Sequence, residues 1–106
     1  MRYVSTRGKS PEVSFQEVLL RGLAPDGGLY LPTSWPQFNV KELRKALGDN
    51  FSYQALASEI IYPFTKDSVE KDELSELIHR AYDSFSAEDI VPMKRLKSKL
   101  WIAELF

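Results

Sequence analysis

The strongest constraint on the fold is an apolar stripe with helical spacing in the second half of the chain. Its members recur every three or four positions, at Leu74, Leu77, Ile78, Ala81, Tyr82 and Phe85. Residues with this spacing share one face of a helix, and that face is stable only when it packs against another element. The stripe therefore predicts an amphipathic helix that reaches Phe85 and is capped at its start by Asp67 or Ser68.

Two helices nearer the amino terminus are predicted from residues at their ends. Ser14, followed three residues later by Glu17, has the pattern of a capping box, and Gly22 is suited to end that helix. Asn39 is a good first residue for a short second helix, which Gly48 closes.

A further helix is predicted between these two and the long stripe. Ser52 caps it, and its apolar residues lie on one face, at Tyr53, Leu56, Ala57, Ile60 and Ile61. We expect Pro63 to end this helix, because proline has no N–H group to donate to the preceding turn.

Short strands are predicted on either side of the helices. β-branched and aromatic residues indicate strands over residues 2–7, 29–31 and 100–105, with a further extended segment at 91–93. We expect the strand at 29–31 to be buried. With a length of 106 residues, the chain is predicted to be one domain over 1–106, of the α+β class, in which about four helices cover one face of a small sheet.

The aromatic residues are the expected core of this domain. Trp35 and Phe38 should anchor the loop at 32–38, because its prolines keep it extended. The other aromatic side chains expected in the core are Tyr53, Tyr62, Phe64, Tyr82, Phe85 and Trp101.

Composition excludes several classes of function. The chain has no cysteine, and its single histidine, His79, is expected on the solvent-exposed face of a helix, so we predict no metal site. A net charge of -1 gives no reason to expect a nucleic-acid partner. No apolar run approaches the roughly 20 residues that span a bilayer, and the start does not resemble a secretory signal, so we expect no membrane association and a cytoplasmic location.

Two polar clusters could contact a ligand. Ser5, Thr6, Arg7 and Lys9 combine hydroxyls with cations, which suits a phosphoryl group, although an ordinary strand end at the surface explains them more simply. The sequence Asp26-Gly27-Gly28 could bring backbone N–H groups to a phosphate, but a tight turn is the better interpretation. No nucleophile, base and orienting group can be assembled, so we assign no catalytic residue.

An ordered set of motifs resembles the amino-terminal domain of threonine synthase, in the monomer-type bacterial and fungal branch. The matching features are Tyr3, Ser5-Thr6-Arg7, Ser14-Phe15, residues 22–29, Pro32, Pro36, residues 82–85, Val91-Pro92 and Glu104-Leu105-Phe106. The resemblance implies a pyridoxal-phosphate lyase of threonine biosynthesis, which converts O-phosphohomoserine to threonine and phosphate.

The same resemblance implies that these residues do not catalyse that reaction alone. In the family, Glu-Leu-Phe leads into His-Gly-Pro-Thr and then Phe-Lys-Asp, whose lysine holds the cofactor. We therefore expect a structural domain, inactive by itself and without bound cofactor, whose partner is the remainder of the same polypeptide. Its substrate-side candidates are Thr6, Arg7 and Asp26.

The alternative hypothesis is a free-standing interaction or regulatory module with the same fold. A reading frame that continues into the lysine motif favours the first hypothesis, and a stop codon favours the second. In either case we expect an exposed apolar docking surface, through which the chain could also form a dimer.

Overall fold

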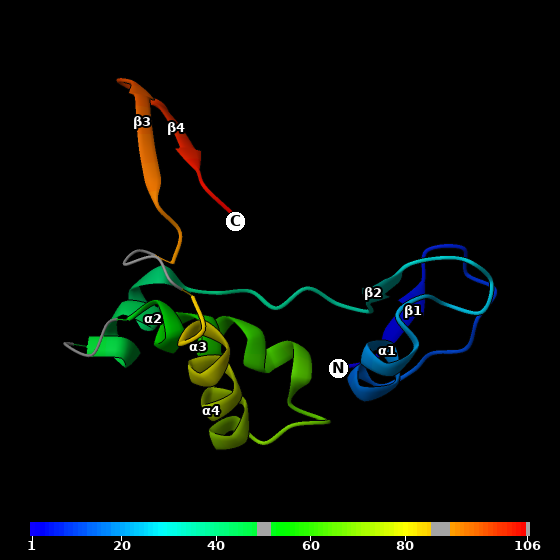
Figure 1. The fold of residues 1–106 in the computed structure, drawn as a ribbon. Helices are drawn as coiled ribbons and strands as arrows, with labels where there is room; N and C mark the ends of the chain where they lie inside the picture. The colour runs from blue at the N-terminus through cyan, green and yellow to red at the C-terminus, as the bar shows by residue number, and fades with distance from the viewer. Residues whose placement is uncertain (49–51, 86–89, 106) are drawn as a thin grey trace.

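A computed structural model describes residues 1–48, 52–85 and 90–105. It has an amino-terminal lobe, a helical lobe and a hairpin that extends away from both (Figure 1). The elements in chain order are β1 (Tyr3–Ser5), α1 (Phe15–Arg21), β2 (Tyr30–Pro32), α2 (Val40–Leu47), α3 (Tyr53–Thr65), α4 (Lys71–Tyr82), β3 (Met93–Lys97) and β4 (Leu100–Ala103). Phe106, the last residue of the Glu-Leu-Phe motif, lies outside the described residues.

The amino-terminal lobe consists of α1 and the antiparallel pair β1–β2. Tyr3 lies opposite Pro32 in this pair, and it also forms an isolated bridge to Val13. The predicted capping box of α1 is confirmed: the Ser14 hydroxyl accepts from the Glu17 N–H, and the Glu17 carboxylate accepts from the Ser14 N–H. The buried apolar side chains described in this lobe are Tyr3, Val13 and Ala24.

The helical lobe packs α2, α3 and α4 together. The predicted caps Asn39 and Ser52 are confirmed, each accepting a backbone N–H of its helix. Tyr53 of α3 meets Tyr82 of α4 edge to face, with ring centroids 5.2 Å apart. Nearer the start of α4, Lys71 Nζ lies 2.6 Å from Oε1 of Glu59, in the middle of α3. The buried apolar residues described in this lobe are Leu47, Leu74 and Ile78.

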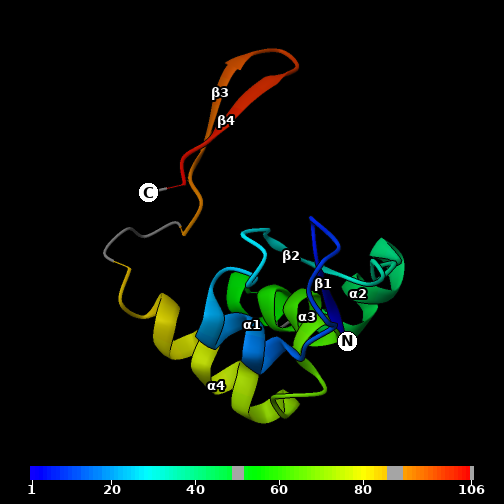
Figure 2. The ribbon, with the colours of Figure 1, turned by 90° about the vertical axis from the view of Figure 1, so that its right-hand side faces the viewer.

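Few polar contacts hold the two lobes together. The Tyr3 hydroxyl donates to the backbone carbonyl of Phe64 over 2.9 Å, and the amino terminus of Met1 pairs with Asp67. The extended segment at 33–39 joins β2 to α2 along the outside of the molecule (Figure 2). The chain thus has two small cores, one in each lobe, instead of one large core.

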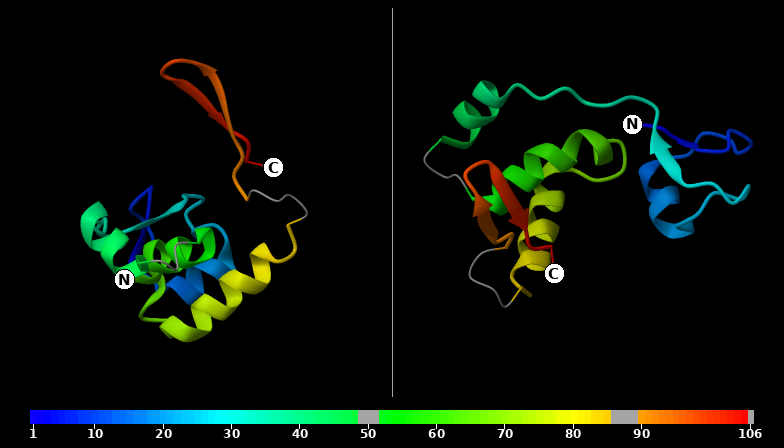
Figure 3. Two further views of the ribbon diagram at one scale, coloured as in Figure 1. Left: turned by 90° about the vertical axis from the view of Figure 1, so that its left-hand side faces the viewer. Right: turned by 90° about the horizontal axis from the view of Figure 1, so that it is seen from above.

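The carboxyl-terminal hairpin consists of β3 and β4, which pair in antiparallel register from Met93 opposite Ala103 to Arg95 opposite Trp101. A bulge follows between Arg95 and Lys97. The hairpin extends away from the helices in the left view of Figure 3. The predicted α+β class with four helices is confirmed, but the strands form two separate pairs, and the helices do not cover β3–β4.

The predicted ends of two helices are wrong. Pro63 lies inside α3, which continues to Thr65, because proline's fixed φ suits a helix and only one hydrogen bond is lost. Neither Asp67 nor Ser68 caps α4; the Ser68 N–H bonds back to Thr65, and the cap position falls on Glu70, which makes no side-chain capping bond. α4 ends at Tyr82 instead of Phe85, whose N–H closes a turn with Tyr82.

The predicted burial of several aromatic and apolar residues is also wrong. Trp35 makes an edge contact with Phe64, yet 65% of it is exposed, and Phe38 is exposed as well. Trp101 is 52% exposed, because the hairpin that carries it has no layer against it. The strand predicted at 29–31 is not buried: Leu29 and Leu31 are both exposed.

The chain is more open than a compact monomer of its size. It exposes 8281 Å², whereas a folded monomer of 12.2 kDa exposes about 6,100 Å². Its radius of gyration is 16.6 Å, against about 13 Å expected for a compact domain of this length. Over the described ranges, none of the helices has the length and apolar character that crossing a bilayer requires.

Candidate functional site

The two polar clusters predicted from the sequence meet in one turn beside β1. The Asp26 carboxylate accepts the Ser5 hydroxyl at 2.6 Å, the Gly28 N–H at 3.0 Å and the Lys9 N–H at 3.0 Å. Thr6 pairs with Leu29 twice, through its own N–H and through its hydroxyl, which accepts the Leu29 N–H. Asp26 therefore joins its own turn to residues 5–9, which lie about 20 positions earlier in the sequence.

The close approach of these segments requires the two glycines. Gly27 has a φ of +77°, which L-residues with side chains rarely adopt. Gly28 is buried, and a Cβ on it would lie 2.2 Å from the Ser5 Oγ. The turn interpretation of Asp26-Gly27-Gly28 is consistent with this geometry, because both glycines serve the packing of the turn against β1.

The hydrogen bonds to Asp26 change its acidity. The Ser5 hydroxyl, followed by the N–H groups of Gly28 and Lys9, stabilises the charged carboxylate and lowers the pKa of Asp26 to about 2, from an ordinary 3.8. Partial desolvation opposes this shift but is the weaker effect. Asp26 is thus ionised throughout the physiological range, and its oxygens are committed to the turn.

Arg7 is the exposed cation of the cluster. Its side-chain Nη1 donates to the backbone carbonyl of Asp26 over 3.0 Å, and its backbone N–H donates to the Ser5 Oγ over 3.1 Å. Across residues 1–48, 52–85 and 90–105, the guanidinium has no other hydrogen-bond partner and no salt bridge. A guanidinium held by a neutral carbonyl keeps its positive charge and its spare donors, which is the chemistry that binds a carboxylate or phosphate.

The structure thus brings Thr6, Arg7 and Asp26 together, but it gives them different roles. Thr6 and Arg7 are exposed, whereas the Asp26 carboxylate faces Ser5 and the backbone. A ligand at this surface would meet the Arg7 guanidinium and the Thr6 hydroxyl. Asp26 would act on such a ligand only by fixing the position of Arg7.

Other polar residues offer little chemistry. His79 is exposed on α4, as predicted, and its Nδ1 lies 2.8 Å from the carbonyl of Ser75. In the part of the chain that the structure describes, no three histidine or acidic side chains gather where they could hold a metal ion. All the lysines are exposed.

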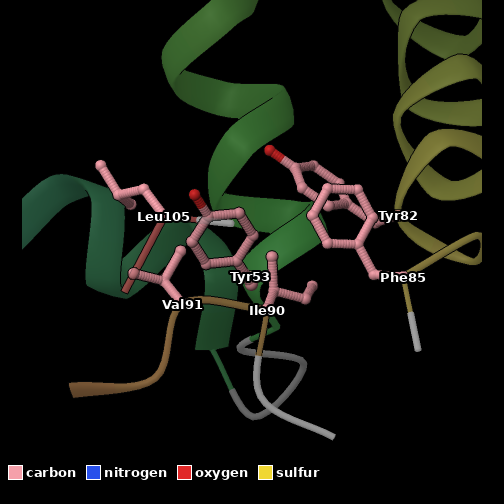
Figure 4. Close-up of a pocket in the computed structure, with 6 residues that line it drawn as sticks. All are labelled: Tyr53, Tyr82, Phe85, Ile90, Val91 and Leu105. Atoms are coloured by element: carbon pink, nitrogen blue, oxygen red, sulfur yellow. The ribbon is translucent and has the colours of Figure 1, made fainter. Parts of the chain in front are cut away.

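An apolar pocket lies between the helices and the base of the hairpin. Figure 4 shows its lining, from which Tyr53 and Ile90 project towards the centre. Its volume is about 260 Å³, and its walls are Tyr53, Tyr82, Phe85, Ile90, Val91 and Leu105. The predicted core placement of Tyr53 and Phe85 is wrong, since both are exposed. The sequence predicts Leu105 in a strand and in the Glu-Leu-Phe motif, and it gives no role to Ile90, which follows the last helix and carries no periodic signal.

A family model described as "Threonine synthase N terminus" matches residues 2–82. A threonine synthase of Pseudomonas aeruginosa is 37% identical over the whole chain, and a threonine synthase-like 2 protein of Homo sapiens is 39% identical over the whole chain. The chain spans 22% of the length of each of these relatives.

Two solved structures are similar over the full chain. A PLP-bound threonine synthase from Brucella melitensis has a TM-score of 0.85 at 38% identity, and the chain covers 22% of it. Threonine synthase from Escherichia coli has a TM-score of 0.77 at 24% identity, with 23% of that chain covered, which supports the fold alone. The arrangement of lobes and hairpin is therefore shared with much longer proteins.

Proposed function

This chain belongs to the threonine synthase N-terminus family, and we propose that it is the amino-terminal structural domain of a threonine synthase, inactive by itself. The complete enzyme would convert O-phosphohomoserine to threonine and phosphate. The observation that carries this proposal is the match to the family over residues 2–82, supported by a similar solved structure over the whole chain. The relatives are several times longer, which favours this hypothesis over a free-standing module.

The chain's own residues are a poor fit for the cofactor. Pyridoxal phosphate, when bound to a lysine, acts as an electron sink for carbanions next to its imine. Such a lysine must lie in a closed site, whereas every lysine here is exposed. We therefore assign the cofactor to the remainder of the enzyme, and we derive no step of the reaction from this domain.

The contribution of this domain is a surface on which the catalytic region packs. Its exposed area exceeds that of a compact monomer by about 2,200 Å², so an unusually large surface is available to a packed neighbour. Large apolar side chains lie exposed in both the amino-terminal lobe and the hairpin, among them Leu19, Leu20, Leu23, Trp101 and Ile102. A cytoplasmic location is part of the same proposal.

We place Arg7 and Thr6 on the side of this domain that borders the substrate, with Asp26 as a positioning residue. The support is the guanidinium that the turn holds in place without neutralising it. Both the substrate and the cofactor carry a phosphate, the group that arginine recognises best.

The test uses a chimera in which this chain replaces the matched segment of the Pseudomonas aeruginosa relative. The chain alone and the chimera are each incubated with pyridoxal phosphate, and the visible absorbance of protein-bound cofactor is recorded after desalting. We expect bound cofactor in the chimera only. Bound cofactor on the chain alone, or production of threonine by it, would overturn the proposal.

The placement of Arg7 is tested separately, in the same chimera. Arg7→Lys keeps the charge but not the planar donor geometry, so we expect KM for O-phosphohomoserine to rise with little change in stability. Arg44→Lys, on an exposed part of α2, is the control. Equal KM values for the two variants would remove Arg7 from the substrate side.

A further inference from the structure

Among the residues that the structure describes, no layer of side chains packs against either face of the β3–β4 hairpin. Every residue of both strands is exposed, and the left view of Figure 3 shows the hairpin extending clear of the helices. An isolated two-stranded hairpin is at best marginally stable in water. Its exposed large apolar residues are Met93, Leu96, Leu100, Trp101 and Ile102.

Local contacts hold the base of the hairpin. The Glu104 N–H donates to the Pro92 carbonyl over 3.0 Å, and Glu104 pairs with Lys94. Arg95 lies over the ring of Trp101, with its guanidinium carbon 5.8 Å from the ring centroid. These contacts fix the register of the two strands, and no other strand of the described residues pairs with either outer edge.

The two outer edges differ in charge. β3 carries Lys94, Arg95 and Lys97 within five residues, whereas β4 reads Leu-Trp-Ile-Ala and carries no charge. Charged residues, lysine above all, protect an edge strand from pairing with another strand. β4 is apolar, has strong β-propensity and has no such protection, so its edge is the one that is suited to pairing.

The register shows which backbone groups that edge presents. In an antiparallel ladder, residue pairs that exchange backbone hydrogen bonds alternate with pairs that do not. Because Glu104 and Pro92 form a hydrogen-bonded pair, the next such pair is Ile102 with Lys94. The N–H groups of Trp101 and Ala103 therefore point outward from the β4 edge.

We propose that the outer edge of β4 pairs with a β-strand from the cofactor-binding region of threonine synthase, so that the hairpin becomes part of a larger sheet. This inference rests on the proposed function and adds the mode of attachment. The occupant follows from the comparisons: relatives of several times this length contain the whole matched segment, and a long solved chain has the same fold over all of it. The absence of charge along β4 and the exposure of all its residues then locate the contact.

The test is amide hydrogen exchange in the chimera, read residue by residue by mass spectrometry with electron-transfer fragmentation. We expect the amides of Trp101 and Ala103 to exchange at least about tenfold more slowly than those of Met93 and Arg95, which lie on the other edge. Exchange of all four amides at the same fast rate, in a chimera that binds cofactor, overturns the edge pairing and leaves the proposed function standing.

A pair of proline variants tests the same edge through its backbone. Ala103→Pro removes an outward N–H group of β4, and Met93→Pro removes the outward N–H group directly across the hairpin. We expect Ala103→Pro to lower the melting temperature of the chimera and Met93→Pro to leave it close to the parent's. Equal effects of the two variants would refute the assignment to β4.

The isolated chain distinguishes the occupants. Slow exchange at Trp101 and Ala103 that appears in the isolated chain only as its concentration rises would show pairing between two copies. If the same amides also exchanged fast in the chimera, the partner of the β4 edge would be a second copy of this chain, and the proposed pairing with the cofactor-binding region would be wrong. A chimera that neither binds cofactor nor makes threonine would instead remove the proposed function itself.

Discussion

The substitution Gly28→Ala tests most sharply how the turn beside β1 is built. A Cβ at this position would lie 2.2 Å from the Ser5 Oγ and 3.0 Å from both the Asp26 Oδ1 and the Thr6 Oγ1. Ordinary contacts begin near 3.4 Å. The Ser5 hydroxyl would thus have to move by about 1 Å and would lose its 2.6 Å hydrogen bond to Asp26.

We expect Gly28→Ala to lower the free energy of unfolding by about 2 kcal/mol, the middle of the range for overpacking a tight site. In a chain of this size, that loss corresponds to a fall in melting temperature of roughly 8–16 °C. Urea and thermal unfolding followed by circular dichroism measure both quantities. Gly8→Ala is the control, because a Cβ at this position meets nothing within 4 Å. Its only cost is the backbone strain of an alanine at a φ of +66°, which is about 1 kcal/mol.

A double-mutant cycle identifies the cause. Ser5→Ala removes the oxygen that the new Cβ would meet, so the double variant should lose less stability than the two single variants together, by about 1 kcal/mol. Strict additivity would refute the steric explanation. A Gly28→Ala chain as stable as the parent would refute the geometry of the turn.

Three further predictions concern single contacts. Because the pKa of Asp26 is lowered to about 2, its stabilising effect is complete above pH 3.8 and is lost as the pH falls through 2; stability in Asp26→Asn should therefore fall less between these values, in urea titrations at each pH. Tyr3→Phe removes the hydrogen bond to Phe64 between the lobes and should cost about 1 kcal/mol, with faster amide exchange in α3. Ser14→Ala should cost about 1 kcal/mol of stability. Hydrogen bonds from the Ser14 backbone N–H and hydroxyl lower the pKa of Glu17, and the variant loses only the hydroxyl, so carboxyl NMR should show the pKa of Glu17 rising part of the way to its ordinary value.

The sequence predicted local features well because nearby residues determine them. Ser14 with Glu17, Asn39 and Ser52 cap their helices as expected, since a cap needs only a side chain and the N–H groups two or three residues on. The prediction that Pro63 ends its helix is wrong, because a proline near the carboxyl end of a helix costs only one hydrogen bond.

Burial could not be predicted from the same patterns. Trp35 and Trp101 have the composition of core residues, but whether they are covered depends on elements that pack against them. The site shows the same limit, since the sequence predicts Thr6 and Arg7 in one polar cluster and Asp26 in another. Their contact depends on the pairing of β1 with β2, more than 20 residues apart in sequence, which no local pattern specifies.

The central claim is that this chain supports the catalytic region of a threonine synthase without reacting itself. The most direct measurement is the rate of threonine formation from O-phosphohomoserine by the chimera, the Pseudomonas aeruginosa parent and the chain alone. The account predicts a chimera kcat within about tenfold of the parent, a barrier difference under about 1.4 kcal/mol, and no threonine from the chain alone. A chimera that folds and binds cofactor but makes no threonine, or a chain that makes threonine by itself, would contradict it.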